Sequence, residues 1–554
     1  MSGRPGVYPD PVDVLVIGAG MGGAAITKFL AEAGISVVCL EQGPWVRPDQ
    51  RPHYSPNYEI QRTSGSWHTS PNVRRLAHDY PVTGDSVVPL MYNGVGGSTI
   101  HFTGTWPRYR PSDFRRGTEH GLCPDWPITY EDLHPFYEIN DHEMGIAGLA
   151  GDPSYPARGA RQTPPVPPGR TGQIAARGFE RLGWHWWPCD MAIVTQPYDG
   201  RQPCNNCGNC QSGCPHGSIA NTAVTYWPKA LRAGADLRPN CRVEEITVDP
   251  AGHATGAAYI DRATGTRYHQ RAEIVVVCCN GIGTPRLLLA SRSGKYPAGL
   301  ANSSDQVGRN LMHHGIAMVE HWVREPLDSH MGVMSAPCFS MEFAETDPAR
   351  GAVNGIALVI CRDNGAGFQA MGSLTGNVAP WGNAHHRWFK EHFDHVLGVL
   401  VYSEDLPMPE NRVTLDPQVK DSDGIPAPHV EYTLHPNDRK LLDFGVERAL
   451  ELGEAIGAFE SRVQRYATPT RDYQPPAWHL LGTCRMGDDP ATSVTNKWHQ
   501  SWDVPNLYIC DGSSVVTSAS INPTSTIGAL AVRCAHHLRD HFAELRHAVR
   551  TAAD

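Results

Sequence analysis

The chain has 554 residues, of which 40% are hydrophobic, and a formal net charge of −10. This length is enough for a large core and for more than one domain. The negative charge argues against binding to nucleic acid or to an acidic membrane surface. No apolar run reaches transmembrane length, and the first twelve residues contain no signal-peptide core. We therefore expect a soluble protein without a signal peptide, cytoplasmic by default.

The amino-terminal segment predicts a βαβ unit. Val12–Ile17 is a short β-rich run, a helical stretch follows it up to Ala33, and Ser36–Leu40 has the composition of a second strand. A glycine-rich turn, GAGMGG, joins the first strand to the helix. Strand, glycines, helix and strand in this order are the context that a dinucleotide-binding motif requires.

Each glycine of this turn has a separate expected role. Gly18 permits the tight turn, Gly20 lets the backbone approach a pyrophosphate, and Gly23 lets the helix pack closely on the strand. The pyrophosphate is expected at the helix amino terminus, where free N–H groups favour an anion. Glu41, 23 residues after Gly18, is placed to accept hydrogen bonds from a ribose. The motif alone does not separate FAD from NAD.

A crowded cysteine run lies at Pro203–Ser218 (PCNNCGNCQSGCPHGS). Cys204, Cys207, Cys210 and Cys214 follow the spacing C-x2-C-x2-C-x3-C-P. Bacterial ferredoxins hold iron–sulfur clusters on this spacing, and thiolates are soft ligands that suit such clusters. The run therefore predicts an iron–sulfur cluster.

Two other readings of the cysteine run stay open. Structural zinc usually uses two separated C-x2-C pairs rather than one run. Disulfides between such close neighbours would be strained. The other eleven cysteines are scattered, which is typical of a reducing compartment rather than of a disulfide framework.

The second half of the chain predicts a sheet with helices and then a return to the first fold. Val353–Cys361 and His395–Val401 resemble strands, and Asn437–Ile456 is a long helical segment. Leu507–Cys510 predicts a further strand, and Thr524–Leu538 predicts a further helix.

Taken together, the chain resembles the glucose–methanol–choline (GMC) family of flavin oxidoreductases. The segments that carry the likeness occur in the family's order between residue 12 and about residue 540; they are the βαβ unit, Gly94–Gly104 (GVGGSTIHFTG), Glu273–Ser291 (EIVVVCCNGIGTPRLLLAS), Val307–His313 (VGRNLMH), His479–Gly487 (HLLGTCRMG), Leu507–Gly512 (LYICDG) and Ser520–Ile527 (SINPTSTI). The resemblance implies FAD as the cofactor. It also implies an α/β, GMC-type fold, in which a Rossmann-like FAD-binding domain joins a second domain of antiparallel sheet plus helices.

On this basis we expect a discontinuous FAD-binding domain, residues 1–319 and 470–554, which includes the cysteine loop 203–218. Residues 320–469 are expected to form the substrate-binding domain. Trp381, His385 and Trp388 are candidates for lining its pocket, because aromatic side chains stack on sugar faces.

The resemblance also implies the cofactor-binding residues. Besides the amino-terminal turn and Glu41, they are Gly96, Gly97, Ser98, His101, Val243, Asp511, Gly512, Asn522, Pro523 and Thr524. In some relatives a histidine at the position of His101 carries FAD covalently, whereas in others the cofactor is not bonded. The carboxylate of Asp511 follows a predicted strand, where doubly wound sheets bind ligands. The helix start after Asn522 suits an electron-rich group.

Two residues match the family's catalytic positions, His479 and Asn522. Oxidation of an alcohol requires a base for the hydroxyl proton while hydride leaves the same carbon. A histidine can be this base near neutral pH. The Asn522 amide cannot take a proton, so it would orient the hydroxyl by hydrogen bonding. A lone histidine would by default be structural, and it is the motif that favours a base.

The expected function is an FAD-dependent dehydrogenase that oxidises a CH–OH group of a sugar, glycoside or polyol and exports electrons through the cluster. Relatives with such a run are iron–sulfur sugar dehydrogenase catalytic subunits; they carry a 3Fe-4S cluster on C-x5-C-x3-C, which Cys204, Cys210 and Cys214 reproduce. Cys207 departs from this pattern and leaves 4Fe-4S open. Those relatives use a small partner subunit with the export signal, so a cytochrome acceptor and periplasmic co-export are the alternative to the cytoplasm. An oxidase that uses oxygen, and an electron-transfer subunit, are the competing functions.

Overall fold

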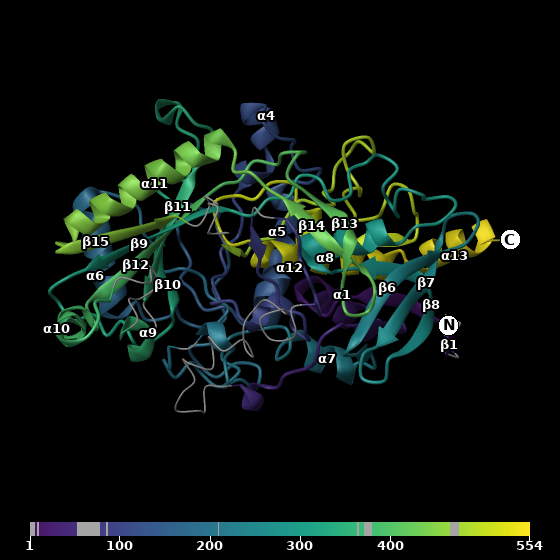
Figure 1. Ribbon diagram of the computed structural model, residues 1–554, viewed down its shortest axis with the longest axis horizontal. Coiled ribbons are helices and arrows are strands. Elements are labelled where there is room, and N and C mark those ends of the chain that lie inside the picture. The colour runs from purple at the N-terminus through teal and green to yellow at the C-terminus, as the bar shows by residue number, and fades with distance from the viewer. Residues whose placement is uncertain are drawn as a thin grey trace.

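In the computed structural model, two β-sheets lie towards opposite ends of the long axis, with α5 (Tyr130–Met144) and α12 (Thr524–Asp540) between them (Figure 1). The structure describes residues 6–7, 10–51, 78–84, 87–208, 210–362, 365–370, 379–465 and 476–553. Asn209 of the cysteine loop lies outside these ranges, as does most of the segment 1–9 on which the signal-peptide expectation partly rests. No helix within these ranges has both the length and the apolar character needed to cross a membrane.

The larger sheet combines parallel and antiparallel strands. Within the described residues it has eight strands, in the order β5-β3-β2-β8-β7-β6, and both β1 and β17 also pair with β8. Strands β5, β3, β2, β8 and β17 are parallel, whereas β6, β7 and the first half of β8 form an antiparallel meander. The bounds are β1 (Gly6–Val7), β2 (Val12–Ile17), β3 (Val37–Leu40), β5 (Asp236–Arg238), β6 (Cys241–Val248), β7 (Ala254–Asp261), β8 (Thr266–Val277) and β17 (Leu507–Ile509).

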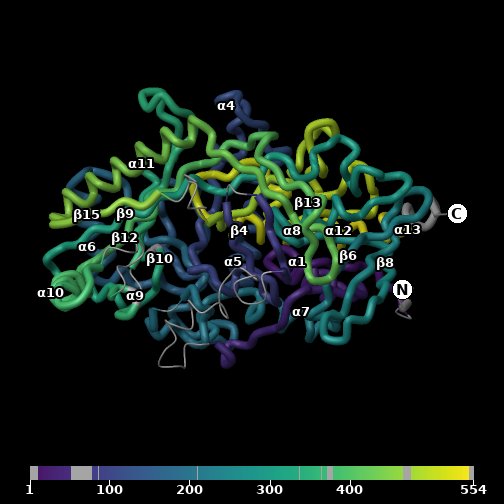
Figure 2. Tube along the Cα trace, viewed as in Figure 1, coloured from purple at the N-terminus to yellow at the C-terminus, as the bar shows by residue number. Residues whose placement is uncertain are grey.

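Helices from distant parts of the chain cover this sheet. Helix α1 (Met21–Glu32) packs against α12 and against α7 (Tyr226–Arg232), and α12 packs against α5. The purple amino-terminal and yellow carboxy-terminal segments therefore lie side by side (Figure 2). Strand β2 is a run of buried Val, Leu and Ile at its carboxyl end, as expected for a parallel strand that is covered on both faces.

The second sheet is antiparallel, in the order β10-β11-β12-β9-β15. Its strands are β9 (Gly315–Trp322), β10 (Ser335–Ser340), β11 (Ile356–Arg362), β12 (Val396–Ser403) and β15 (Glu460–Arg465). Helices α11 (Pro436–Ala455) and α6 (Gly169–Leu182) pack against it. The α/β class, with a Rossmann-like part and an antiparallel sheet plus helices, is thus confirmed. The expected boundary at residues 319 and 320 falls inside β9, and the division into domains stays a prediction.

Shorter elements connect these layers. They are β4 (Val88–Pro89), β13 (Arg412–Lys420), β14 (Pro426–Glu431), β16 (Pro476–Ala477), α4 (Arg116–His120), α8 (Asn280–Ala290), α9 (Ala366–Ala370), α10 (Asn383–His392), α13 (Phe542–Ala553), and the 3-10 turns η1 (Pro48–Gln50), η3 (Gly97–Ile100), η4 (Pro111–Phe114), η5 (Cys210–Ser212), η6 (Pro348–Arg350) and η7 (Gly512–Ser514).

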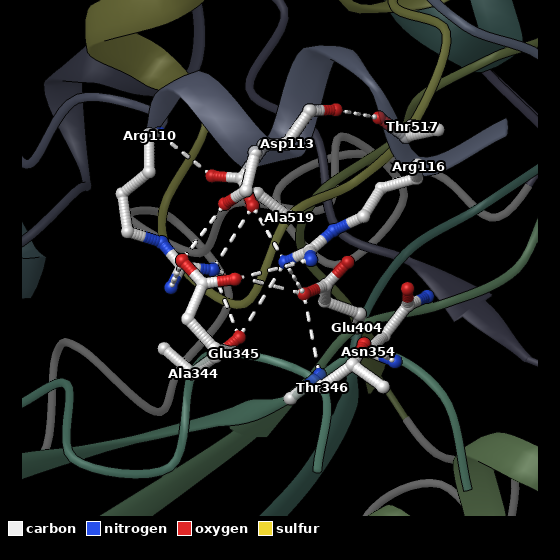
Figure 3. Close-up of polar contacts among 12 residues, drawn as sticks. Arg110, Asp113, Arg116, Ala344, Glu345, Thr346, Asn354, Glu404, Thr517 and Ala519 are labelled. Atoms are coloured by element: carbon white, nitrogen blue, oxygen red, sulfur yellow. Dashed lines mark hydrogen bonds and ion pairs between the residues drawn. The ribbon is translucent and has the colours of Figure 1, made fainter. Parts of the chain in front are cut away.

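A group of charges, which we call the ionic cluster, joins the two parts of the fold; it consists of the buried Arg110, Asp113, Arg116 and Glu404 and the exposed Glu345 (Figure 3). Arg116 Nη2 lies 2.9 Å from Asp113 Oδ1 and 2.9 Å from Glu404 Oε1. Arg110 Nη1 lies 2.7 Å from Glu345 Oε1. Glu404 directly follows β12, whereas both arginines flank η4. The ionic cluster therefore ties the second sheet to the region around η4.

Candidate active site

A cavity of about 570 Å³ lies between the glycine turn after β2 and the second sheet. Residues from both parts of the fold line it, including Met21 at the start of α1 and Tyr402 of β12. Most of the predicted site residues contribute to its wall: Gly18, Gly20, Glu41, Gly97, Ser98, His101, His479, Asp511, Gly512, Asn522, Pro523 and Thr524.

Glycine is needed at the three positions of the amino-terminal turn for different physical reasons. Gly18 has φ +102°, and a Cβ there would overlap the carbonyl of Cys278. A Cβ on Gly23 would overlap the carbonyl of Gly18, so the packing of α1 on β2 requires glycine. By contrast, a Cβ on Gly20 would have only Gly97 Cα within 4 Å, at 3.7 Å. Gly20 therefore keeps the cavity open rather than making the fold possible.

The second glycine-rich loop meets the first. Gly97 has φ +53°, and a Cβ on it would lie 2.7 Å from Gly20 Cα. Gly96 precedes η3 with φ +100° and does not line the cavity. This part of the wall is consequently formed by backbone, which suits close approach of a phosphate-bearing cofactor.

Glu41 has a role in the protein that the sequence did not reveal. Its carboxylate accepts hydrogen bonds from the backbone N–H groups of Ala19 and Gly43, both at 2.9 Å, and it also lines the cavity. Val243 lies elsewhere, in an adjoining cavity of about 60 Å³ that shares Gly18 with the larger one. The two cavities extend along the carboxyl ends of β2 and β3, where doubly wound sheets bind nucleotides.

Residues 511–524, near the carboxy terminus, contribute a further part of the cavity wall. Asp511 accepts hydrogen bonds from Asn280 N at 2.9 Å, Thr284 Oγ1 at 2.6 Å and Ser513 N at 2.7 Å, while burial raises its pKa. It therefore links α8 to η7. The start of α12, with Pro523 and Thr524, lines the cavity, and the positive end of a helix dipole there suits an electron-rich ligand.

His479 and Asn522 lie next to each other in the cavity wall. Asn522 Nδ2 lies 3.2 Å from His479 Nε2, and His479 Nδ1 lies 2.8 Å from His314 Nδ1. Burial lowers the pKa of His479 well below its usual value, and His314 and His313 lower it further. The imidazole is therefore neutral at pH 7 and able to take a proton.

The opposite wall comes from the second sheet together with the segments that follow η3 and β16, and the sequence did not identify it. The sheet contributes Met318, Ser335, Cys361, Leu400 and Tyr402, and the neighbouring segments contribute Phe102, Thr103, Thr105, Met334 and Trp478. The suggested pocket residues Trp381, His385 and Trp388 do not line the cavity, and Trp381 is 97% exposed. In β9 and β12 nearly every residue is buried, so an alternating pattern could not show which side chains face the ligand.

The cysteine loop lies beside the cavity. Cys210 and Cys214 are buried, Cys204 and Cys207 are half-buried, and all fifteen cysteines, every one within the described ranges, are free thiols. Burial raises the pKa of Cys210, and the nearby thiols of the other three raise it further. No three metal-binding side chains in the part of the chain that the structure describes are gathered so that they could hold a metal ion. The iron–sulfur cluster stays a prediction.

One contact connects this loop to the cofactor cavity. His101 Nδ1 lies 2.7 Å from the carbonyl oxygen of Gln211, and both residues line the cavity. Since a carbonyl can only accept, His101 carries its proton on Nδ1. Gln211 stands next to Cys210 in the chain, so the cysteine loop contributes to the cavity wall and is bonded there to His101.

A glycine-rich βαβ unit, a backbone-walled cavity and a histidine–asparagine pair define a flavin-dependent oxidoreductase. Comparison with family models agrees: residues 11–61 match an FAD-binding domain, and residues 158–316 and 407–531 match the two GMC oxidoreductase models. The chain belongs to the GMC oxidoreductase family and is an FAD-dependent oxidoreductase.

The similarity to known proteins extends over almost the whole chain. The chain is 51% identical to 2-methyl-1,2-propanediol dehydrogenase of Mycolicibacterium austroafricanum, over 97% of this chain and 96% of that protein. It is 30% identical to the fructose dehydrogenase large subunit of Gluconobacter japonicus, over 94% and 97%. Among solved structures, a variant of formate oxidase from Aspergillus oryzae RIB40 has a TM-score of 0.67 at 15% identity, covering 97% of this chain and 99% of that one. This last likeness concerns the fold alone.

Proposed function

We propose that the chain is an FAD-dependent dehydrogenase that oxidises a hydroxyl group of a small aliphatic alcohol or diol to a carbonyl. The observation that carries this proposal is the His479–Asn522 pair, which lies in the same cavity as the glycine loops and the amino terminus of α12. A sugar, glycoside or polyol is the substrate class predicted from the sequence.

The chain's own groups account for the proton half of the reaction. The turn at Gly18 and Gly20, the start of α1 and Glu41 would hold FAD, which supplies the acceptor for hydride. His479 Nε2 takes the hydroxyl proton as the C–H hydride leaves, and Asn522 Nδ2 donates a hydrogen bond to the substrate oxygen. The low pKa of His479 keeps it neutral before the proton arrives.

The lining of the substrate side favours a small and largely apolar alcohol. Met318, Met334, Leu400 and Cys361 offer hydrocarbon and sulfur surface, and among the described lining residues few hydroxyl groups accompany them. A small alcohol packs its hydrocarbon part against this surface at little cost, whereas each pyranose hydroxyl that finds no partner there is costly in a buried site. The similarity to a 2-methyl-1,2-propanediol dehydrogenase supports the same substrate size.

The test is anaerobic mixing of the holoenzyme with 2-methyl-1,2-propanediol, glucose, fructose and a methyl glycoside. We expect the diol to bleach the oxidised flavin fastest. Faster bleaching by a sugar would reject the small-alcohol assignment, and no bleaching by any alcohol would reject the dehydrogenase. Rapid oxygen consumption with the same substrate would identify an oxidase instead.

We further propose that electrons leave through an iron–sulfur cluster on Cys204, Cys210 and Cys214, with Cys207 as a possible fourth ligand. Three positive side chains surround the loop, which favours an anionic cluster of thiolates. Arg51 Nη1 donates to the carbonyl of Cys214 at 3.3 Å, and Arg201 and Arg362 interact electrostatically with the thiols. The hydrogen bond from His101 to Gln211 supports a short route from the flavin site to this loop.

Cys210→Ser tests this route, with Cys123→Ser as the control because Cys123 lies outside the loop. We expect Cys210→Ser to keep FAD and to be reduced by substrate, but to lose its iron and its steady-state reduction of a cytochrome. The control Cys123→Ser should keep both its iron and its steady-state reduction of a cytochrome. A thermal melt must accompany the assay, since metal binding and folding are coupled. Intact cytochrome reduction in anaerobically purified protein without iron would overturn the proposal.

This route also implies a docking surface near residues 203–218 for a one-electron acceptor such as a cytochrome. A small partner subunit, and export to the periplasm together with it, belong to the same proposal; without such a partner the protein would stay in the cytoplasm. Co-expression with a candidate small subunit, followed by size-exclusion chromatography and cell fractionation, tests both.

A further inference from the structure

The second ring nitrogen of His479 is held by a buried histidine. His479 Nδ1 lies 2.8 Å from His314 Nδ1, and His314 Nε2 lies 2.9 Å from the carbonyl oxygen of Ala519. His314 is 1% exposed. It directly follows the segment Val307–His313, which the sequence singled out only as a family motif.

The direction of these hydrogen bonds follows from the acceptor at the end of the chain. A carbonyl oxygen can only accept, so His314 Nε2 carries a proton and donates it. Burial lowers the pKa of His314 to about 4, so the ring is neutral and its Nδ1 is an acceptor. His479 must therefore donate from Nδ1, which leaves its Nε2 without a proton.

The other side of His479 agrees with this assignment. The amide nitrogen of Asn522 can only donate, and it lies 3.2 Å from His479 Nε2. Nε2 must accept in this contact. Both neighbours of His479 thus require the same tautomer, with the proton on Nδ1 and the lone pair on Nε2.

The backbone that supplies the terminal acceptor is held in an uncommon conformation. Ala519 has φ +53°, a left-handed geometry that residues with a side chain rarely adopt. Ser518 Oγ accepts from Asp405 N at 2.8 Å, and its one proton has two acceptors at 3.2 Å, the carbonyl oxygens of Ala519 and Asp405. Ala519 and Asn522 are three residues apart, so one short loop determines the contacts on both sides of His479.

We propose that His314 is a positioning residue that holds His479 in the tautomer whose Nε2 accepts the hydroxyl proton. This inference rests on the proposed role of His479 as the base. During the reaction the substrate O–H bond breaks, the proton moves to His479 Nε2 and hydride leaves to FAD. His479 then carries protons on both nitrogens and keeps its hydrogen bond to His314. The other titratable groups nearby are His313 and Tyr402.

Two substitutions of His314 separate positioning from simple packing. His314→Leu removes the acceptor, whereas His314→Asn keeps a side-chain carbonyl near the place of Nδ1. We expect His314→Leu to reduce flavin about 10- to 100-fold more slowly with little change in substrate affinity, because a buried donor loses its partner. His314→Asn should restore much of the rate. His321→Gln is the matched control, since His321 is equally buried but bonds to Ser461.

A readout that does not depend on turnover is the tautomer itself. In holoenzyme labelled with ¹⁵N-histidine, long-range ¹H–¹⁵N correlations distinguish the Nδ1–H ring from the Nε2–H ring, and the signals lost in His479→Gln identify His479 among the 27 histidines. We expect Nδ1–H in the wild type and in His321→Gln, and a mixture in His314→Leu. FAD content and a thermal melt confirm that each variant is folded.

The outcomes separate this inference from the proposed function. Near-native turnover of His479→Gln would reject the base itself. Loss of turnover in His479→Gln, combined with an unchanged rate and tautomer in His314→Leu, would reject only the positioning role. An Nε2–H signal for His479 in the wild type would overturn the positioning role directly.

Discussion

Replacing Gly20 by valine is expected to abolish FAD binding and leave the fold of the protein intact. Gly20 has φ −79° and ψ −154°, an extended conformation outside the left-handed region that favours glycine. Its Cβ would have only Gly97 Cα within 4 Å, at 3.7 Å, which is an ordinary contact. We therefore expect the apoprotein to lose less than about 1 kcal/mol of unfolding free energy, as is usual for substitutions that create no overlap.

Adding FAD makes the difference in cofactor binding between the wild type and Gly20→Val measurable as a difference in stability. A ligand present at 100 times its Kd stabilises the native state by about 2.7 kcal/mol. Denaturation of the wild type should therefore shift by about this free energy when FAD is added to that excess, whereas Gly20→Val should not shift. Flavin retained after gel filtration, measured by absorbance, gives an independent value.

Gly23→Ala is the matched control. Its Cβ would overlap the carbonyl oxygen of Gly18, so either α1 or β2 must move. We expect little soluble, folded protein from this variant even with FAD present. A Gly20→Val protein with a full complement of flavin would refute the assignment of Gly20 to the cofactor, and a normally folded Gly23→Ala protein would refute the steric reasoning.

Three further outcomes follow from the structure. His479→Ala should lower the rate of substrate-dependent flavin reduction by about 10²–10⁴-fold with FAD retained, and near-native turnover would exclude it as the base. Burial raises the pKa of Asp405 to about 7 and that of its neighbour Asp438 well above the usual range. The native state therefore binds protons more tightly than the unfolded state. The free energy of unfolding should fall as pH rises from about 4 through 7. Asp405→Asn should flatten this dependence in thermal melts at a series of pH values, and an unchanged slope would contradict it. Arg116→Ala should cost about 3 kcal/mol in chemical denaturation because two buried carboxylates lose one of their cationic partners and keep only Arg110, whereas the exposed Arg47→Ala should cost less than about 1 kcal/mol; equal costs would refute the role of the ionic cluster.

More of the residues predicted for the cofactor lie in the cavity wall than of those predicted for the substrate pocket, and the binding roles of both sets stay predictions. The glycine turns and the start of α12 depend on backbone geometry and a helix end, Glu41 directly follows β3, and Asp511 closely follows β17; such features leave local patterns in a sequence. The substrate wall depends on which face of β9 and β12 meets the cavity. Since nearly all residues of these strands are buried, no alternation marks the inner face.

His314 was missed for a different reason. Its neighbour Ala519 lies 205 residues away in the chain, and neither residue type indicates a hydrogen bond between them. Only the assembled fold brings the ring nitrogen to a carbonyl in left-handed backbone. The cysteine run is the opposite case, because its spacing is a strong local signal whereas the described thiols do not form a metal-binding group.

The discontinuous origin of the larger sheet has a consequence for how the protein is made. The strand β2 pairs with β8, β8 pairs with β17, and α12 covers α1, so the carboxy-terminal segment completes a structure that the first residues begin. Asp511 leaves the ribosome 493 residues after Gly18 (511 − 18), a delay of roughly 25 to 100 s at about 5–20 residues per second. During synthesis the nascent chain exposes the apolar faces of β2 and α1 and has no cavity for FAD. We therefore expect FAD to bind only after the carboxy-terminal segment has been synthesised, so that a shortage of FAD would leave full-length apoprotein.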